Sequence, residues 1–318
     1  MVVDNMLNTI LITGGTGMVG KNLINHSQAE NCSNLIAPTR NQVNLLDYNS
    51  IKEFMQSTKP DLVIHAAGKV GGISANMADP YGFLYENLTM GMNVVHAAKE
   101  SGVKKLINLG SSCMYPRNAL NPLREQDLLT GELEPTNEGY AIAKNAVAKL
   151  CLAACSIGYS YKSFIPCNLY GYWDNFHPVN SHMIPAIVRK VYESKKNNDT
   201  PIEIWGSGTV KRESLFAEDL ADFIYFAADN FDRVPNILNV GSGVQYSILE
   251  YYETAKKALD AKGEFVFDLS KPEGMKQKVV DVAEQTKLGW HPKTDLYTGF
   301  EKTYKYYRDL IECQKQHL

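Results

Sequence analysis

The stretch Thr9-Ile-Leu-Ile-Thr13-Gly-Gly-Thr-Gly-Met-Val-Gly20 decides the fold class. Its first five residues are apolar or β-branched and predict a short buried strand. Three glycines follow at once, and each suits a separate task in a dinucleotide-binding turn. Gly14 permits a tight turn, Gly17 lets the backbone approach a pyrophosphate, and Gly20 lets the next helix pack on the strand. The residues expected to line this cofactor site are Gly14, Gly15, Thr16, Gly17, Met18, Val19 and Gly20.

The rest of the first 170 residues repeats this alternation of strands and helices. Strands are expected at 35–37, 61–65, 105–109 and 161–165, and helices at 18–26, 50–56, 87–101 and 140–154, with Ser50 as a candidate N-cap. Strands and helices that alternate at this spacing indicate βαβ units with a parallel sheet. We therefore expect an α/β fold with a Rossmann-type, doubly wound sheet.

The alternation weakens beyond Tyr170. Residues 168–181 are rich in Gly, Pro, His and Asn, which predicts a loop, and a helix is expected behind it at 183–193. Residues 236–240 predict a strand that returns to the first sheet. We expect a cofactor domain over 1–170, with a returning segment near 205–245, and a smaller α/β substrate domain over 171–318 that is interleaved with it.

Composition excludes several classes of partner. The net charge is −3 and 44% of residues are hydrophobic, so the sequence predicts a buried core but no nucleic-acid or anionic-membrane partner. No apolar run approaches the ~20 residues that span a bilayer. Residues 1–9 lack the pattern of a signal peptide. The six cysteines show no zinc-site spacing. We expect a cytoplasmic protein without a metal.

Arg40 indicates which dinucleotide binds. An acidic residue about 20 positions past the glycines would bind a ribose 2′-hydroxyl and favour NAD. Arg40 stands after the second expected strand instead, and its guanidinium suits a 2′-phosphate. The sequence therefore favours NADP.

Tyr140 and Lys144 lie four residues apart and share one face of an expected helix. A lysine beside a tyrosine is expected to lower the phenol's pKa, so that the tyrosine can donate a proton as hydride arrives at a carbonyl carbon. Ser111 follows another expected strand at its carboxyl end, where ligands of such sheets bind. Its hydroxyl could hydrogen-bond the same substrate oxygen.

Together, these motifs resemble the extended short-chain dehydrogenase/reductase family. The resemblance implies hydride transfer from a nicotinamide, with Ser111, Tyr140 and Lys144 as catalytic residues. It also adds residues to the expected cofactor site, namely Leu109, Gly110, Ser111, Ser112, Lys144, Pro166, Asn168, Leu169 and His182.

Longer stretches are similar to one branch of that family, the GDP-L-fucose synthases. They are 69–73 with 75–76, 110–116, 133–138, 168–171, 174–178, 181–185 and 205–208. The branch implies that a GDP-linked 4-keto-6-deoxy-mannose is epimerised at C3 and C5, after which NADPH reduces C4. The ketone acidifies the neighbouring C–H groups, and epimerisation needs a base and an acid on opposite faces. By resemblance, Cys113 is the base, His182 is the acid, and the protein is a homodimer.

The same resemblance assigns the nucleotide sugar to four residues. Trp205 would stack on guanine and Arg212 would hold the diphosphate. Lys190 and, more weakly, Asp281 complete the expected substrate site.

Three departures from the branch leave the particular sugar open. Gly139 stands where proline usually precedes the tyrosine, residues 172–173 read Tyr-Trp instead of Pro-His, and residues 271–278 lack a usual Thr-Pro-Arg. All three could line the sugar or nucleotide pocket. A GDP-L-colitose synthase, which acts on a 3-deoxy sugar and epimerises only C5, would use the same residues.

Two other activities fit parts of the sequence. A C4 reductase would not need Cys113 and His182, and a non-catalytic NADP-sensing regulator would not need the Tyr140–Lys144 pair. The presence of all four residues favours the bifunctional enzyme over both.

Overall fold

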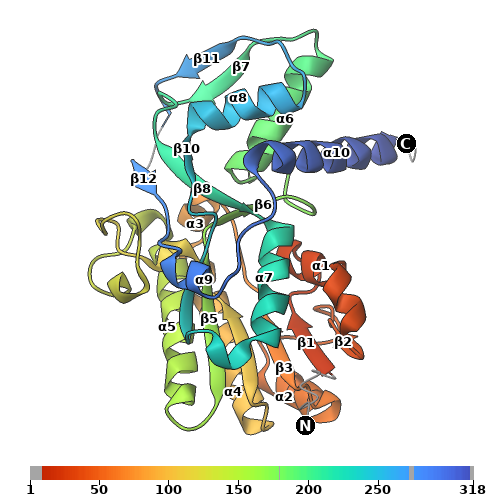
Figure 1. Ribbon diagram of the computed structural model, residues 1–318, viewed down its shortest axis with the longest axis vertical. Helices are drawn as coiled ribbons and strands as arrows, with labels where there is room; N and C mark the ends of the chain where they lie inside the picture. Colours follow the sequence, from red (N-terminus) through yellow and green to blue (C-terminus); the bar gives the residue numbers. More distant parts are fainter. Residues whose placement is uncertain (1–8, 179, 272–275, 316–318) are drawn as a thin grey trace.

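A parallel sheet forms the larger part of the molecule (Figure 1). The computed structural model describes residues 9–178, 180–271 and 276–315, so the start of the chain and the middle of the departing stretch 271–278 lie outside it. Within the described residues this sheet has six strands in the order β2-β1-β3-β4-β5-β9, and every neighbouring pair is parallel. The expected doubly wound α/β fold is confirmed.

The six strands are β1 (Thr9–Thr13), β2 (Asn34–Ile36), β3 (Leu62–His65), β4 (Lys105–Leu109), β5 (Ser160–Pro166) and β9 (Ile237–Val240). The helices that accompany them are α1 (Met18–Ile24), α2 (Tyr48–Thr58), α3 (Ile73–Ala78), α4 (Pro80–Glu100), α5 (Glu138–Cys155), α7 (Ala217–Asp229) and α9 (Ala283–Lys287).

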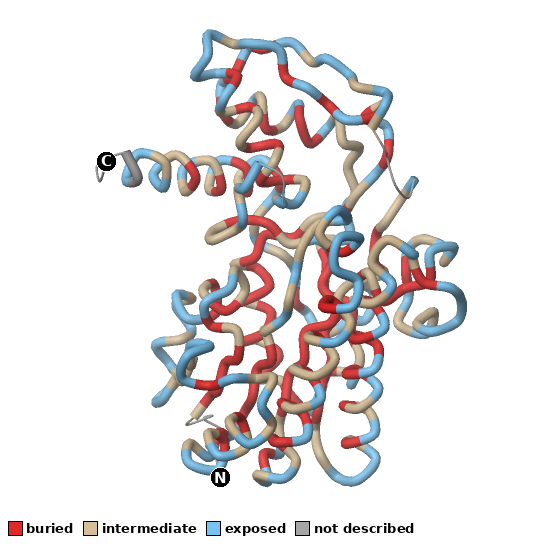
Figure 2. Tube along the Cα trace, turned by 180° about the vertical axis from the view of Figure 1, so that it is seen from behind, coloured by how far each residue is buried: buried red, intermediate tan, exposed pale blue. Residues whose placement is uncertain are grey.

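Alternate residues of each strand bury opposite faces of the sheet. Ile10 and Ile12 of β1 join a cluster with Leu23 of α1 and Phe223 of α7, whereas Leu11 joins α2, α4 and α5 on the other face. This alternation follows from the two-residue period of a strand. Figure 2 shows the resulting buried band through the centre of the lower half of the molecule.

The remaining elements gather at one end of this sheet. They are β6 (Asn168–Tyr170), β7 (Ile202–Trp205), β8 (Lys211–Phe216), β10 (Gln245–Ser247), β11 (Phe265–Asp268), β12 (Gln277–Lys278), α6 (Met183–Lys196), α8 (Ile248–Ala258) and α10 (Leu296–Lys315). Helices α6, α8 and α10 share a separate apolar cluster with residues such as Ile204 and Phe216. In Figure 1 these elements form the upper part of the molecule.

Local chemistry explains where the structure differs from the expected elements. Helix α2 is capped by Asp47, not Ser50, because the Asp47 carboxylate accepts from the N–H groups of Asn49 and Ser50. Helix α4 begins at Pro80, seven residues earlier than expected, because Asp79 caps it and proline suits the first turn. The first three residues of the expected loop 168–181 form β6 instead, since β8 supplies a partner strand.

No helix in the described part of the chain combines the length and apolar character needed to cross a bilayer. All six cysteines are free thiols.

Candidate active site

The glycine turn between β1 and α1 has the shape that the sequence predicts. Gly14 has φ +80°, and a Cβ there would lie 2.6 Å from the backbone of Ala67. A Cβ on Gly20 would overlap the Gly14 carbonyl oxygen, so glycine is required for α1 to pack this closely. Gly17 is exposed, and a Cβ there would meet Gly14 at an ordinary 3.5 Å. This side of the turn leaves room for a phosphate group.

The other expected cofactor residues lie around the carboxyl ends of neighbouring strands. Arg40 is exposed on the loop that follows β2. Leu109 ends β4, and the N–H of Gly110 donates to the Phe164 carbonyl of β5 at 2.7 Å. Pro166 ends β5, and Asn168 and Leu169 lie in β6 directly beyond it. The parallel sheet therefore brings these segments to the same edge as the glycine turn.

Ser111 and Cys113 occupy a short turn directly after β4. Ser111 caps the 3₁₀ helix Ser112–Met114, and its hydroxyl oxygen accepts from the Cys113 N–H at 3.2 Å. Ser112 is buried, whereas Ser111 and Cys113 are half-buried. The turn thus presents one hydroxyl and one thiol at the strand end.

Helix α5 brings Tyr140 and Lys144 to this turn. The Lys144 ammonium donates to the Leu109 carbonyl at 2.9 Å and lies 5.7 Å from the Tyr140 ring centroid. The Ser111 side chain lies close enough to the Tyr140 phenol to influence its pKa. The four expected catalytic residues from 111 to 144 therefore converge.

The expectation that Lys144 lowers the phenol's pKa is wrong for this structure. Burial, together with the nearby Cys113, raises the pKa of Tyr140, and the nearby Ser111 hydroxyl offsets this only in part. The Lys144 ammonium is directed to Leu109, and burial lowers the lysine's own pKa to about 8. Tyr140 consequently holds its proton at neutral pH, as a proton donor must.

Sequence reasoning missed two residues that touch the Cys113 sulfur. The Asn137 amide donates to Sγ at 3.3 Å, and the Lys278 ammonium lies 3.5 Å from Sγ. An adjacent ammonium and an amide donor stabilise the negative charge of a thiolate. Both residues lie in stretches that the sequence already singled out, Asn137 in 133–138 and Lys278 at the end of 271–278. Nothing in the sequence linked Lys278 to Cys113, however, because the two are 165 residues apart.

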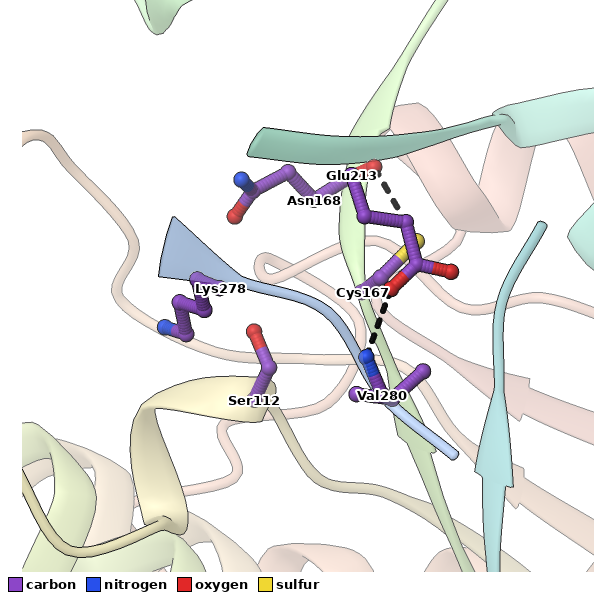
Figure 3. Close-up of a pocket in the computed structure, with 6 residues that line it drawn as sticks. All are labelled: Ser112, Cys167, Asn168, Glu213, Lys278 and Val280. Carbon is purple, nitrogen blue, oxygen red and sulfur yellow. Dashed lines mark hydrogen bonds between the residues drawn. The ribbon is translucent and has the colours of Figure 1, made fainter. Parts of the chain in front are cut away.

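Backbone bonds hold Lys278 in place. The Val279 N–H donates to the Asn121 side chain, and Leu123 exchanges hydrogen bonds with the backbone of 279 and 281. Figure 3 shows the Lys278 ammonium pointing away from Glu213, whose carboxylate accepts from the Val280 N–H at 2.7 Å. Lys278 is thus directed to the cysteine, although an acidic residue lies on the neighbouring strand.

His182 is the N-cap residue of α6. Its side chain is exposed to solvent, yet enough protein surrounds it for desolvation to lower its pKa. None of the hydrogen bonds among the described residues joins it to Cys113 or Tyr140. Its assignment as the acid of the epimerisation, and as a cofactor contact, stays a prediction.

The expected substrate residues extend from the cluster toward α6. Arg212 of β8 pairs with Lys278 of β12 in the parallel register. Burial lowers the pKa of Arg212, and its side chain is half-buried. Trp205 and Lys190 lie together at the end of β7, with the ammonium 5.2 Å from the ring centroid.

Asp281 is the least supported of the four expected substrate residues. Its carboxylate accepts from the Ala283 N–H at 2.9 Å, in the turn that begins α9. Its backbone carbonyl accepts from the Asn239 side chain. These local bonds explain the residue without a ligand, and a substrate role stays a prediction.

The structure gives local reasons for two of the three departures. A Cβ on Gly139 would lie 2.9 Å from the Pro80 carbonyl oxygen, so glycine lets the starts of α4 and α5 pack closely. Tyr172 and Trp173 place their rings against Tyr306 of α10, at 5.9 and 6.1 Å. In the third departure, residues 272–275 lie outside the described residues, and its last residue, Lys278, is the one that contacts Cys113.

This arrangement supports two kinds of proton transfer beside a nucleotide site. A hydroxyl and a protonated phenol are positioned for a carbonyl oxygen, and a thiol with a cationic neighbour is positioned to take a proton from carbon. The described residues contain no group of three or more His, Cys, Asp or Glu side chains that could hold a metal ion.

Comparison with known families agrees with this geometry. The model of the NAD dependent epimerase/dehydratase family matches residues 10–241, which is most of the chain. The chain belongs to this family. The match spans the glycine turn, the turn after β4 and the Tyr140 helix, and it ends before Lys278. The matched range therefore contains Ser111, Tyr140 and Lys144, but not Lys278, the cationic partner of Cys113.

Individual relatives extend the likeness over nearly the whole chain. A GDP-L-colitose synthase of Yersinia pseudotuberculosis is 47% identical over 300 residues, covering 94% of this chain and 97% of the relative. A GDP-L-fucose synthase of Azorhizobium caulinodans is 44% identical, with 94% and 96% covered. The expected resemblance to this branch is confirmed.

A solved structure shows the same fold with a cofactor. A GDP-L-fucose synthetase from Naegleria fowleri, bound to NADP, superposes with a TM-score of 0.87 at 28% identity. The superposition covers 96% of this chain and 94% of that one. The upper group of elements is thus similar in arrangement as well as the sheet.

Proposed function

We propose that this chain is an NADPH-dependent epimerase–reductase of a GDP-linked 4-keto-6-deoxy-mannose, with GDP-L-fucose as product. One observation carries the proposal: Cys113, contacted by Asn137 and Lys278, lies in the same turn as Ser111, which is close to the Tyr140 phenol. A reductase alone needs Ser111 and Tyr140. The supported thiol gives the site a base for epimerisation.

The residues divide the reaction into two parts. The Cys113 thiolate takes the proton from a carbon beside the ketone, and His182 returns one on the opposite face. Lys278 offsets the thiolate charge, since it lies 3.5 Å from the sulfur. Tyr140 then donates its proton to the C4 oxygen, which the Ser111 hydroxyl orients.

The structure also fits NADP(H), the cofactor named for the Naegleria relative. A Cβ on Gly14 or Gly20 would clash with neighbouring backbone, and Gly17 is exposed with room for a phosphate beside it. Arg40 on the loop after β2 would hold the 2′-phosphate. When bound, the nicotinamide supplies the hydride that reaches C4.

The test is to separate exchange from reduction. Cys113→Ser should abolish deuterium incorporation at C3 and C5 of the keto sugar in heavy water, while NADPH binding remains unchanged. Ser156→Ala, on an exposed residue at the end of α5, serves as the control. Retained exchange in Cys113→Ser would show that the cysteine is not the base.

A second sugar is supported by the relative named GDP-L-colitose synthase, at 47% identity. Its substrate would lack the 3-hydroxyl, and only C5 would be epimerised. Turnover of the 3-hydroxy and 3-deoxy forms of the GDP-4-keto sugar, compared at equal concentration, distinguishes the two. Preference for the 3-deoxy form would replace GDP-L-fucose as the proposed product.

We also propose a homodimer and the domain division given by the sequence. Exposed apolar side chains lie on α4 and α5, namely Tyr81, Tyr85, Met92 and Ile142, and these helices pack together. A patch of this kind suits pairing with the same helices of a second copy. Sedimentation of the Tyr85→Glu variant should show a monomer.

The separate apolar clusters support the proposed division into a cofactor domain and a smaller substrate domain.

A further inference from the structure

Trp205 is an unusually exposed aromatic ring within a charged setting. Its exposed fraction is 53%, although tryptophan is normally largely buried. The ammonium groups of Lys190 and Lys271 lie 5.2 and 5.4 Å from the ring centroid. An open indole beside two cations is suited to a flat, electron-rich ligand that carries phosphates.

A carboxylate is fixed at the edge of this ring. Glu203 Oε2 accepts from the Trp205 indole N–H at 2.7 Å and from the Lys190 ammonium at 3.0 Å. The same ammonium donates to the Glu203 backbone carbonyl at 2.9 Å. Among the described residues, Oε1 accepts no hydrogen bond. The carboxylate is thus oriented by two donors and keeps one oxygen for a ligand.

The surroundings of the Glu203 carboxylate also favour its ionised form. The hydrogen bonds from Lys190 and Trp205 hold the pKa of Glu203 below its usual value. An ionised carboxylate accepts hydrogen bonds and donates none. A ligand edge must therefore present donors to it, and an acceptor placed there would be repelled.

Guanine is the common base that meets this requirement. Its Watson–Crick edge carries two adjacent donors, N1–H and the 2-amino group, whereas the same edge of adenine pairs one donor with an acceptor. A base stacked on Trp205 would bring its edge to the rim of the ring where Glu203 lies. Carboxylate bonds to such donors are charge-assisted and strong.

We infer that Glu203 is a base-specificity residue, which accepts hydrogen bonds from guanine N1–H and the 2-amino group while Trp205 stacks on the base. The inference rests on the proposed function, which supplies a GDP-linked substrate. Under this inference, Lys190 does not bind the substrate directly, contrary to the expectation from the sequence. It is a positioning residue that orients the Glu203 carboxylate.

The experiment compares GDP with inosine diphosphate, which differs only by lacking the 2-amino group. Both are titrated by calorimetry in the presence of saturating NADP, so that the cofactor site is filled. Wild-type protein should bind GDP about 10–100-fold more tightly, the usual value of a hydrogen bond to a charged group. Glu203→Gln should bring this ratio close to one, and Glu264→Gln, on an exposed residue near β11, should leave it unchanged.

The outcomes separate this inference from the proposed function. A Glu203→Gln protein that loses affinity for both nucleotides equally, with the ratio preserved, would show that Glu203 only positions the ring, and would overturn the inference. Wild-type protein that binds GDP without preferring it over inosine diphosphate would also overturn it, while leaving the GDP-sugar substrate intact. Absence of GDP binding altogether would overturn both.

Discussion

The glycine turn and the surroundings of Cys113 are two parts of one active site that are built in opposite ways. The turn is encoded within twelve consecutive residues, from Thr9 to Gly20, although the folded sheet brings Ala37 and Ala67 against its glycines. The Cys113 cluster joins the ends of β4, α5 and β12, and Lys278 is 165 residues from the cysteine it contacts. Local chemistry made the first region predictable, and tertiary structure alone assembles the second.

The largest expected effect concerns the reduction step, which depends on both regions of the active site. Tyr140→Phe removes the phenolic proton, so NADPH oxidation by the keto sugar should fall about 10²–10⁴-fold. Deuterium exchange at C3 and C5 should persist, because Cys113 and His182 are unchanged. Loss of both reactions in a protein that still binds NADP would show that the two steps share the tyrosine.

A pair of alanine substitutions tests the locally encoded region. Gly14 and Gly102 both have positive φ, +80° and +76°, but only Gly14 has backbone atoms within 3 Å of a new Cβ. Gly102→Ala should cost about 1–2 kcal/mol of unfolding free energy from conformational strain. Gly14→Ala should cost about 2–5 kcal/mol, because overpacking adds to that strain.

Urea unfolding measures both costs, and NADP titration then shows whether the turn still binds. Equal destabilisation by the two alanines would mean that the Ala67 contact yields easily and that the turn is less rigid than its geometry indicates.

Lys278→Met tests the region assembled from distant segments. Without the ammonium beside the sulfur, exchange should slow about 10–100-fold, since charge-assisted contacts are worth about 1.5–3 kcal/mol. Alkylation of Cys113 by iodoacetamide, followed by peptide mass spectrometry, should slow in parallel. Lys278→Arg should restore part of both rates, and Lys276→Met, on an exposed residue two positions away, should change neither. An unchanged alkylation rate in Lys278→Met would remove the lysine from the mechanism.

The smallest expected effect is a pH dependence. Burial lowers the pKa of Lys144 to about 8, so its ammonium is present below that pH and is lost as the pH rises through it. The kcat/KM for reduction should therefore decline above about pH 8. The unfolded chain keeps this proton up to about pH 10.5, so the lysine's contribution to unfolding free energy should rise between the two values. Lys144→Met should lose that rise, which a comparison of urea midpoints at pH 8 and 10 would detect.

Most of the fold could be predicted from the sequence because its first 170 residues combine strand-length apolar runs with helical stretches. The predicted secondary structure was wrong where contacts with another segment determine whether residues form a strand, a helix or a loop. Residues 168–170 have loop composition, yet β8 recruits them as a strand. Asp79 extends α4 by seven residues, because a cap and a proline outweigh a weak periodic pattern.

The candidate site shows the same limit. Ser111, Cys113, Tyr140 and Lys144 were identified and do converge, but the direction of the Tyr140 pKa shift was wrong because burial cannot be read from a YxxxK spacing. The role of Glu203 depends on its contact with Lys190, across the turn from α6 to β7. An isolated glutamate in a strand gives no such indication.

The anchoring of Lys278 also bears on the order in which the enzyme matures during synthesis. The backbone of Leu123 holds residues 279 and 281, so the segment that carries this lysine can dock only after nearly the whole chain has been made. Because N-terminal parts of a chain fold first on the ribosome, the nucleotide-binding sheet would form well before the cysteine gains its cationic neighbour. A chain that ended early, near the point where the family model stops at residue 241, would retain the glycine turn, Tyr140 and Cys113 but lack the lysine at position 278.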